Sequence, residues 1–172
     1  MRALFLSLTL AIASVGFASA QEQTTSDGRP PIICNQGALT TGLLCEGDFC
    51  DDISMRCTSF SREVRRTYWT NFVKTRFGTT AFCSMRGSEN RGFMSGIACE
   101  GDWCDNVALQ CTELQLFEPD FRRCVWSRSF SDEDDWQSWV SPFYYVVALD
   151  CSSDRHCDNK RVRMCRIKRR SR

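Results

Sequence analysis

Two short stretches of the sequence place carboxylates beside an aromatic ring at the same spacing. Each reads Cys-Glu-Gly-Asp-aromatic-Cys-Asp. Carboxylate oxygens accept hydrogen bonds from hydroxyl groups and an aromatic ring stacks on a sugar ring, so the pattern suits saccharide recognition. The ligand-binding residues that we predict from it are Glu46, Asp48 and Phe49 in the first copy and Glu100, Asp102 and Trp103 in the second. An equally good interpretation is that the aspartates serve turn geometry while the rings pack on a disulfide beneath them.

The same carboxylates permit metal binding and catalysis as further interpretations. Calcium takes six to eight oxygen ligands, and four more side chains lie close in sequence: Asp51, Asp52, Asp105 and Asn106. Their spacing matches no known calcium loop, so we expect no cofactor and keep calcium only as an alternative.

We also expect no enzymatic activity. A glycosidase would use the paired carboxylates Glu46 with Asp48, or Glu100 with Asp102. Active sites are usually single, whereas this pattern is repeated. The one histidine, His156, makes a nucleophile and base pair improbable. A glycosidase therefore remains the weaker alternative.

A run of basic residues near the C-terminus is the other region that suits binding. It holds Arg161, Arg163, Arg166, Lys168, Arg169 and Arg170, and its simplest interpretation is a solvated charged segment. As a binding segment it would attract an anionic envelope surface or polysaccharide with salt-dependent strength. Nucleic acid is not an expected partner, because no aromatic residues are interleaved with the run.

The start of the chain indicates export. Residues 1–20 combine one arginine, an apolar run and the small-residue pattern Ala18-Ser19-Ala20, which predicts a cleaved signal peptide rather than a membrane-spanning helix. Without Arg2, the remaining 21 Lys and Arg balance the 21 Asp and Glu. Residues 21–33 are polar and are predicted to be a flexible lead-in to the folded part. We expect a protein that is secreted, to the periplasm or the extracellular space.

Twelve cysteines in an exported chain predict a disulfide framework. If Gly47-Asp48 and Gly101-Asp102 form two-residue type II′ turns, the cysteines on either side face each other across a hairpin within disulfide reach. This predicts Cys45 with Cys50 and Cys99 with Cys104. Cys34 with Cys57 and Cys83 with Cys111 then remain as outer pairs, and analogy suggests Cys151 with Cys157 and Cys124 with Cys165.

Alternating apolar residues predict strands on both sides of each turn. Leu39, Thr41, Leu43 and Cys45 alternate with polar or small residues, and two later segments repeat this before Cys99 and Cys151. In an uninterrupted hairpin, the apolar residues of the second strand would lie on the opposite face from those of the first strand. We therefore predict bulges that reset the alternation at Asp51-Asp52, Asp105-Asn106 and Asp158-Asn159. Most aromatic residues between the hairpins are expected to fill the core.

Three repeats of this kind, residues 34–68, 69–123 and 124–165, followed by a basic tail at 166–172, predict one all-β domain. Greek-key-like repeats that cannot bury their faces singly would pack around a pseudo-threefold axis. The Trp-containing strands, segments such as Phe93-Met94-Ser95-Gly96-Ile97, and the strands ending in Cys57 or Cys111 resemble the vitelline membrane outer layer protein family. The resemblance implies a disulfide-stapled β-prism, extracellular placement and saccharide-related binding.

These observations together predict a secreted, non-enzymatic protein that binds glycan or cell-envelope material in a lectin-like manner. The alternative is a secreted protein-interaction module, such as an inhibitor or a structural envelope component, whose partner is another protein. No transmembrane segment is expected.

Overall fold

The computed structural model describes residues 21–60, 63–74, 79–101, 104–131, 137–138, 143–151 and 159–170. These residues form β-strands and one short 3-10 turn, which confirms the predicted all-β class. The predicted signal peptide at 1–20 lies outside the described residues. Within the described ranges no helix is long and apolar enough to cross a membrane.

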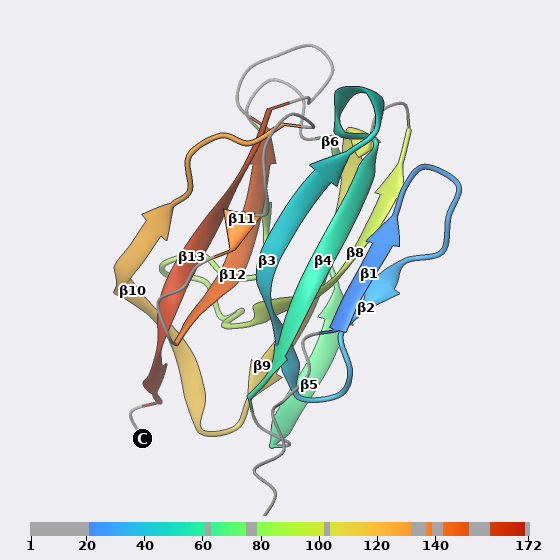
Figure 1. Cartoon of the computed structure of the whole chain (residues 1–172). Coiled ribbons are helices and arrows are strands. Elements are labelled where there is room, and N and C mark those ends of the chain that lie inside the picture. The colour runs from blue at the N-terminus through green and yellow to red at the C-terminus, as the bar shows by residue number, and fades with distance from the viewer. Residues whose placement is uncertain are drawn as a thin grey trace, which may run out of the picture.

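The first structural unit comprises four strands and the 3-10 turn (Figure 1). They are β1 (Gln21–Thr25), β2 (Ile32–Ile33), β3 (Ala38–Glu46), η1 (Asp48–Cys50) and β4 (Asp52–Ser59). The long strands β3 and β4 pair antiparallel as a hairpin, and β1 pairs with the free side of β4.

The second unit repeats this order with one additional short strand. Its elements are β5 (Val64–Trp69), β6 (Val73–Lys74), β7 (Ala81–Phe82), β8 (Phe93–Glu100) and β9 (Asn106–Leu114). The hairpin is β8–β9, and β5 and β6 both pair with β9.

The third unit contains β10 (Phe117–Trp126), β11 (Gln137–Ser138), β12 (Tyr144–Cys151) and β13 (Lys160–Arg169). Its hairpin is β12–β13, with β10 on the free side of β13.

In every unit, the strand that directly precedes the hairpin joins the sheet of another unit. Sheet A has the order β1-β4-β3-β11, sheet B has β2-β8-β9-β5, and sheet C has β10-β13-β12-β7. Thus β2 leaves the first unit for sheet B, β7 leaves the second for sheet C, and β11 leaves the third for sheet A. The exchange is cyclic, so each sheet is completed by a strand from a different unit.

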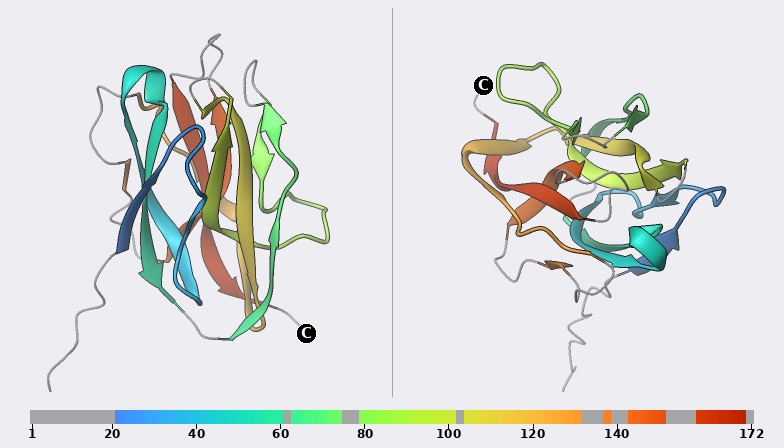
Figure 2. Two further views of the ribbon diagram at one scale, coloured as in Figure 1. Left: turned by 90° about the vertical axis from the view of Figure 1, so that its right-hand side faces the viewer. Right: turned by 90° about the horizontal axis from the view of Figure 1, so that it is seen from above.

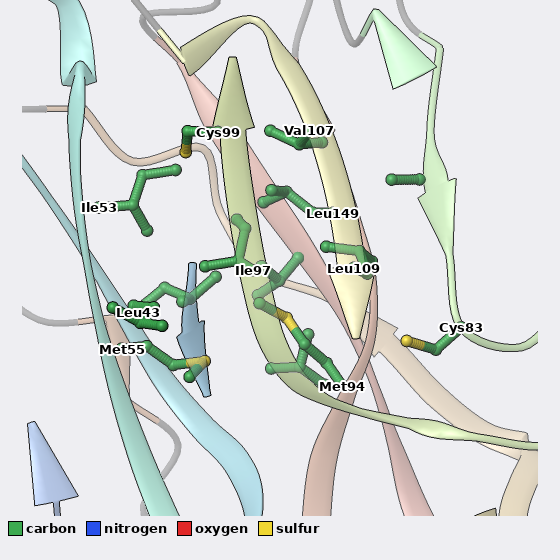
Figure 3. Packing of buried hydrophobic residues seen from close by; sticks show 14 of the residues in the cluster. Leu43, Ile53, Met55, Cys83, Met94, Ile97, Cys99, Val107, Leu109 and Leu149 are labelled. Atoms are coloured by element: carbon green, nitrogen blue, oxygen red, sulfur yellow. The ribbon is translucent and has the colours of Figure 1, made fainter. Parts of the chain in front are cut away.

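The three sheets surround a common interior, as the view from above shows (Figure 2). Their central strands β3, β8 and β12 each contact the other two. Leu43, Ile97 and Leu149 lie at equivalent positions of these strands and are buried in one core cluster (Figure 3). A second cluster contains Leu39 and Phe93, together with residues from the third unit.

Each hairpin carries one bulge, but not where the sequence analysis places it. The extra residue is Thr41 in β3, Ser95 in β8 and Val147 in β12, whereas the pairing through Asp52 and Asn106 is regular. The predicted bulges at Asp51-Asp52 and Asp105-Asn106 are therefore wrong, and Asp158 lies outside the described residues. The alternation of side chains between the two faces of the sheet is therefore reset in the first strand of each hairpin, not in the second.

The polar segment before Cys34 belongs to the fold. Thr25 at the end of β1 is fully buried, and Ile32 in β2 belongs to the main core cluster. The prediction of a flexible lead-in at residues 21–33 is wrong, because β1 pairs with β4, and β2 pairs with β8 while Ile32 packs in the core.

The predicted limits of the repeats need a similar correction. The boundaries after residues 68 and 123 fall inside β5 and β10, which begin the second and third units. The segment predicted as a basic tail from residue 166 is still strand, since β13 continues to Arg169 and pairs with β10.

Five disulfides join described cysteines, and all five are predicted pairs. They are Cys34–Cys57, Cys45–Cys50, Cys83–Cys111, Cys99–Cys104 and Cys124–Cys165. Cys151 is disulfide-bonded too, while its predicted partner Cys157 lies outside the described residues.

Two of these disulfides hold exchanged strands in place. Cys34 follows β2, and its N–H donates to the carbonyl of the bulge residue Ser95 in sheet B at 2.8 Å. Cys83 follows β7 and donates in the same way to Val147 in sheet C, also at 2.8 Å. Because Cys57 lies in sheet A and Cys111 in sheet B, each of these disulfides ties an exchanged strand to the sheet of its own unit.

The bulge of sheet B leaves no room for a side chain at Gly96. A Cβ there would lie 2.8 Å from the carbonyl oxygen of Ile32 and 2.9 Å from Cβ of Gln110. We expect Gly96→Ala to push β2 from β8 and to lower the free energy of unfolding by about 1–3 kcal/mol, measured by chemical denaturation. Gly28→Ala is the control, since its Cβ would meet no atom within 4 Å and only its positive φ costs about 1 kcal/mol. An equal or smaller loss for Gly96→Ala would contradict the packing argument.

Candidate functional site

The tips of the first two hairpins are five-residue loops instead of the predicted two-residue turns. Glu46 pairs with Asp52 and Glu100 with Asn106, so residues 47–51 and 101–105 lie outside the ladders. Cys45 consequently faces Ile53 across the hairpin, not Cys50. The predicted type II′ turns are wrong, and each inner disulfide closes a loop instead of bridging two strands.

Glycine is required where the first loop begins. Gly47 has φ 74°, and a Cβ at this position would collide with the carboxylate of Asp51. The chain then turns through η1 with positive φ at Phe49 and Cys50, which turns the Cys50 side chain into the core while Phe49 stays 46% exposed.

The tip carboxylates point back along their own hairpins. Glu46 Oε2 accepts a hydrogen bond from Ser54 Oγ at 2.9 Å, and Glu100 Oε2 accepts one from Asn106 Nδ2 at 3.3 Å. Asp48 is exposed beside Phe49. Asp102 and Trp103 lie outside the described residues, so the ligand-binding role predicted for the two tips stays a prediction.

The basic residues predicted to bind anions are divided between two places on β13. Arg161 and Arg163 lie in the half near Trp126, where Arg161 binds Asp150 at 2.7 Å and stacks over the Trp126 ring at 4.8 Å. Arg163 has no ion-pair partner in the described part of the chain. Of the other four, Arg166, Lys168 and Arg169 lie toward the C-terminal end of the strand, and Arg170 follows it directly.

At that end, two buried carboxylates bind cations from several strands. Glu113 accepts hydrogen bonds from Arg65 Nη1 at 3.1 Å and Arg66 Nη2 at 2.7 Å. Glu118 binds Arg91 Nη1 at 2.8 Å. Glu118 also binds Lys168 Nζ at 3.2 Å, and Arg170 Nε lies at 3.7 Å from it. We call this group the basal cluster.

Arg91 joins the two halves of the basal cluster. Its backbone N–H donates to Glu113 at 3.2 Å while its guanidinium holds Glu118. Burial alone would raise the pKa of Glu113, but the hydrogen bonds from Arg66 and Arg91, together with the charges of Arg66 and Arg65, outweigh it and lower the pKa. Glu113 is therefore ionised at neutral pH.

A groove of about 240 Å³ lies on one face of sheet B, and sequence reasoning did not find it. Its floor comes from β8 and β9, one wall from β2 and the loop after it, and the other wall from β5. The lining residues are Ile33, Cys34, Asn35, Gln36, Gly37, Val64, Thr67, Ser95, Gln110 and Thr112. None of these ten side chains is charged at neutral pH, and Cys34 is held in its disulfide.

The floor of the groove contains a chain of hydrogen bonds that runs in one direction. Thr67 and Thr112 hydroxyls lie 3.3 Å apart, Thr112 donates to Ser95 at 2.8 Å, and Ser95 donates to Gln110 Oε1 at 3.2 Å. All hydroxyl protons are then used within the chain, with Thr67 donating to Thr112. The amide nitrogen of Gln110 at its end has no partner among the described residues.

Two further amides face this groove from the loop after β2. Asn35 and Gln36 are exposed, and in the described part of the molecule their side chains make no hydrogen bond. Three unpartnered amide groups thus line one uncharged groove, an arrangement that offers both donors and acceptors to a polar ligand.

An exposed tryptophan lies on the same face of sheet B. Trp69 is directly opposite Gln110, as Thr67 is opposite Thr112. Opposite residues of paired strands share a face of the sheet, so the indole lies on the groove side. Trp69 is 39% exposed and Trp126, its counterpart in the third unit, 38%. The expectation that most aromatic residues fill the core is wrong for these two rings.

The alternation around Trp69 was the signal that could have located the groove. In Thr67-Tyr68-Trp69 the outer residues share one face, while Tyr68 packs against the core and its hydroxyl donates to the Cys83 carbonyl at 3.0 Å. Burial, with the charge of Glu113, raises the pKa of Tyr68 to about 12. The missing information was that β2, far from β5 in sequence, supplies the opposite wall.

The fold and the groove together define a class: an all-β, disulfide-rich protein of three strand-exchanged sheets with an uncharged polar groove on one of them. No family model, no curated protein and no solved structure matches the chain. Among the described residues, no group of three or more His, Cys, Asp or Glu side chains is placed to hold a metal ion.

The basal cluster predicts how stability depends on pH. Because the pKa of Glu113 is lower in the folded protein than its ordinary value of 4.5, its contribution to stability is complete above about pH 4.5 and is lost as the pH falls through the folded-state pKa. We expect urea unfolding at a series of pH values to show this loss in the parent protein. Glu113→Gln should be less stable at neutral pH and show a shallower decline in acid.

Asp27→Asn is the control for this experiment, because Asp27 is an exposed turn residue. It should leave the acid decline unchanged. A decline of the same steepness in Glu113→Gln and the parent protein would contradict the assignment.

Proposed function

We propose that the protein is a non-enzymatic, lectin-like protein that binds an oligosaccharide in the groove of sheet B. The observation that carries the proposal is the set of three unpartnered amides, Asn35, Gln36 and Gln110, in one uncharged groove. Sugar hydroxyls both donate and accept hydrogen bonds, and amide groups match both roles. A groove lined without charge favours the uncharged part of a saccharide.

The apolar surfaces around the groove support the same ligand. Trp69 provides an exposed ring beside Gln110, and Ile33 and Val64 line the opposite walls. A saccharide ring has an apolar face of C–H groups that stacks on indole while its edge carries hydroxyls. Stacking on Trp69 and hydrogen bonding to the amides would therefore use both surfaces of one sugar.

The proposed location is outside the cytosol. Disulfides persist in oxidising compartments, and five link described cysteines here. With the predicted signal peptide, this supports secretion. Three sheets around a common interior also agree with the β-prism that the resemblance to the vitelline membrane outer layer family implies, and we propose that architecture for this chain.

The hairpin tips provide a different site for the same function. If the saccharide binds there, Phe49 is the described aromatic residue that it would contact. The protein-partner and glycosidase interpretations remain alternatives that the same experiment separates from ours.

We expect Trp69→Ala and Gln110→Ala each to weaken binding of neutral oligosaccharides by about tenfold or more, through loss of stacking and of an amide contact. The oxidised mature protein is first screened on a glycan array, and the affinity for the best neutral oligosaccharide is then measured by calorimetry. Trp126→Ala is the matched control, because it removes the equivalent ring from sheet C. Phe49→Ala tests the hairpin tips.

Each outcome has a distinct meaning. Loss of affinity in Trp69→Ala and Gln110→Ala alone supports the groove. Loss in Phe49→Ala alone moves the site to the hairpin tips and overturns the groove assignment. Absence of any glycan binding, neutral or acidic, in the parent protein overturns the proposed function, and release of reducing sugar would make the protein an enzyme.

A further inference from the structure

The basal cluster presents more positive charge to solvent than it needs for its own carboxylates. Five cationic side chains, Arg65, Arg66, Arg91, Lys168 and Arg170, surround two carboxylates, Glu113 and Glu118. The cluster lies at the end of the molecule where β9 turns into β10, away from η1 (Figure 1). Glu89 also acts electrostatically on Arg66, so three negative charges face five positive ones and two positive charges remain in excess.

Burial separates the two signs of charge. The Glu113 and Glu118 side chains are 0% and 5% exposed, whereas Arg65, Arg66, Arg91 and Lys168 are between 41% and 54% exposed. The carboxylates therefore lie beneath a rim of cations. An approaching ligand meets the positive side first, and the surface attracts anions.

The buried carboxylates also fix the orientation of the rim. Each one holds a guanidinium at 2.7 or 2.8 Å and a second cation at 3.1 or 3.2 Å. Side chains that are already ordered lose less conformational entropy when a ligand binds. Arg170 adds a further positive charge beneath the rim, with its Nε 3.7 Å from Glu118.

The basal cluster and the groove share strand β5. Val64 and Thr67 line the groove, and the two residues between them are Arg65 and Arg66 of the cluster. Arg66 is opposite Glu113 and therefore lies on the other face of the sheet from Thr67 and the groove, so a ligand chain reaches the guanidinium groups by crossing β5, the edge strand of sheet B. Continuity with a polar, uncharged groove favours a saccharide over other polyanions, because a saccharide combines neutral hydroxyls with acidic groups in one chain.

We propose that the groove and the basal cluster form one continuous site for an acidic oligosaccharide, one that carries uronate carboxylates or sulfates. This proposal rests on the proposed function and names its substrate class. Guanidinium groups bind carboxylate and sulfate oxygens through paired N–H donors, so Arg65 and Arg66 would hold the acidic groups while the amides hold the neutral part.

The test compares three oligosaccharides of equal length by calorimetry at low and high salt: chitohexaose, hexagalacturonate and a heparin-derived hexasaccharide. We expect at least one acidic probe to bind about tenfold or more tightly than the neutral one at low salt and to lose this advantage at high salt. Arg65→Gln combined with Lys168→Gln should remove most of the advantage, with little effect on the neutral probe. Each carboxylate keeps its closest cation in this variant, so the fold is preserved.

The control removes two exposed cations elsewhere. Arg29→Gln combined with Lys74→Gln changes the net charge equally at the other end of the molecule, in the β1–β2 loop and in β6. It should leave acidic binding unchanged. Circular dichroism and thermal unfolding of both variants establish that they are folded.

The outcomes separate this inference from the proposed function. Neutral binding without any acidic advantage overturns the inference and leaves the groove proposal intact. If Trp69→Ala and Gln110→Ala leave the affinity for the acidic oligosaccharide unchanged, the cations bind it without the groove, and the continuous site is overturned. Equal binding of inorganic polyphosphate or duplex DNA overturns the assignment to saccharides.

Discussion

The cyclic exchange of short strands is the constraint on which this structure depends. A hairpin such as β8–β9 has its own outer strand, β5, but its other edge is completed by β2 from the first unit. An unpaired edge exposes backbone donors and acceptors, so each unit needs another to satisfy them. The bulges make the exchange possible, because Ser95 and Val147 turn their carbonyls toward the N–H groups of Cys34 and Cys83. The three units therefore depend on one another for the backbone hydrogen bonds at one edge of each sheet.

The groove is a direct consequence of this exchange. Its floor belongs to the second unit, but Asn35 and Gln36 reach it only because β2 is paired with β8. At the positions that correspond to Trp69 and Gln110, sheet A has Glu22 and Arg56, which form an ion pair at 2.6 Å. Sheets with the same strand arrangement therefore carry different surfaces, because residues at equivalent outward-facing positions differ.

The sequence predicts the features that depend on local order. Alternation located the hairpin strands, and the spacing of cysteines predicted all five disulfides that join described residues. The cysteine spacing could not show the type of turn at the hairpin tips. A five-residue loop with Phe49 and Cys50 at positive φ brings Cys45 and Cys50 together as readily as a two-residue turn does. β1 was not predicted, because its residues are polar and it is held by backbone hydrogen bonds to β4. Lys160 shows the same limit: it begins a basic run, yet it is 1% exposed and its Nζ donates to the Cys50 carbonyl at 3.1 Å.

The change from apolar to charged residues along the interior explains why the cations gather at one end. The equivalent positions of β4, β9 and β13 are the buried Cys57, Cys111 and Met164, and two residues later they are the exposed Ser59, the buried Glu113 and the half-buried Arg166. A carboxylate without solvent must be paired, so the buried Glu113 requires the cations that reach it from β5. Those cations have long side chains whose charged ends stay partly in water. The buried Glu113 at the end of the core thereby determines the charge of the nearby surface. Because this carboxylate must be paired, Arg65 and Arg66 lie on β5, the strand that also lines the groove.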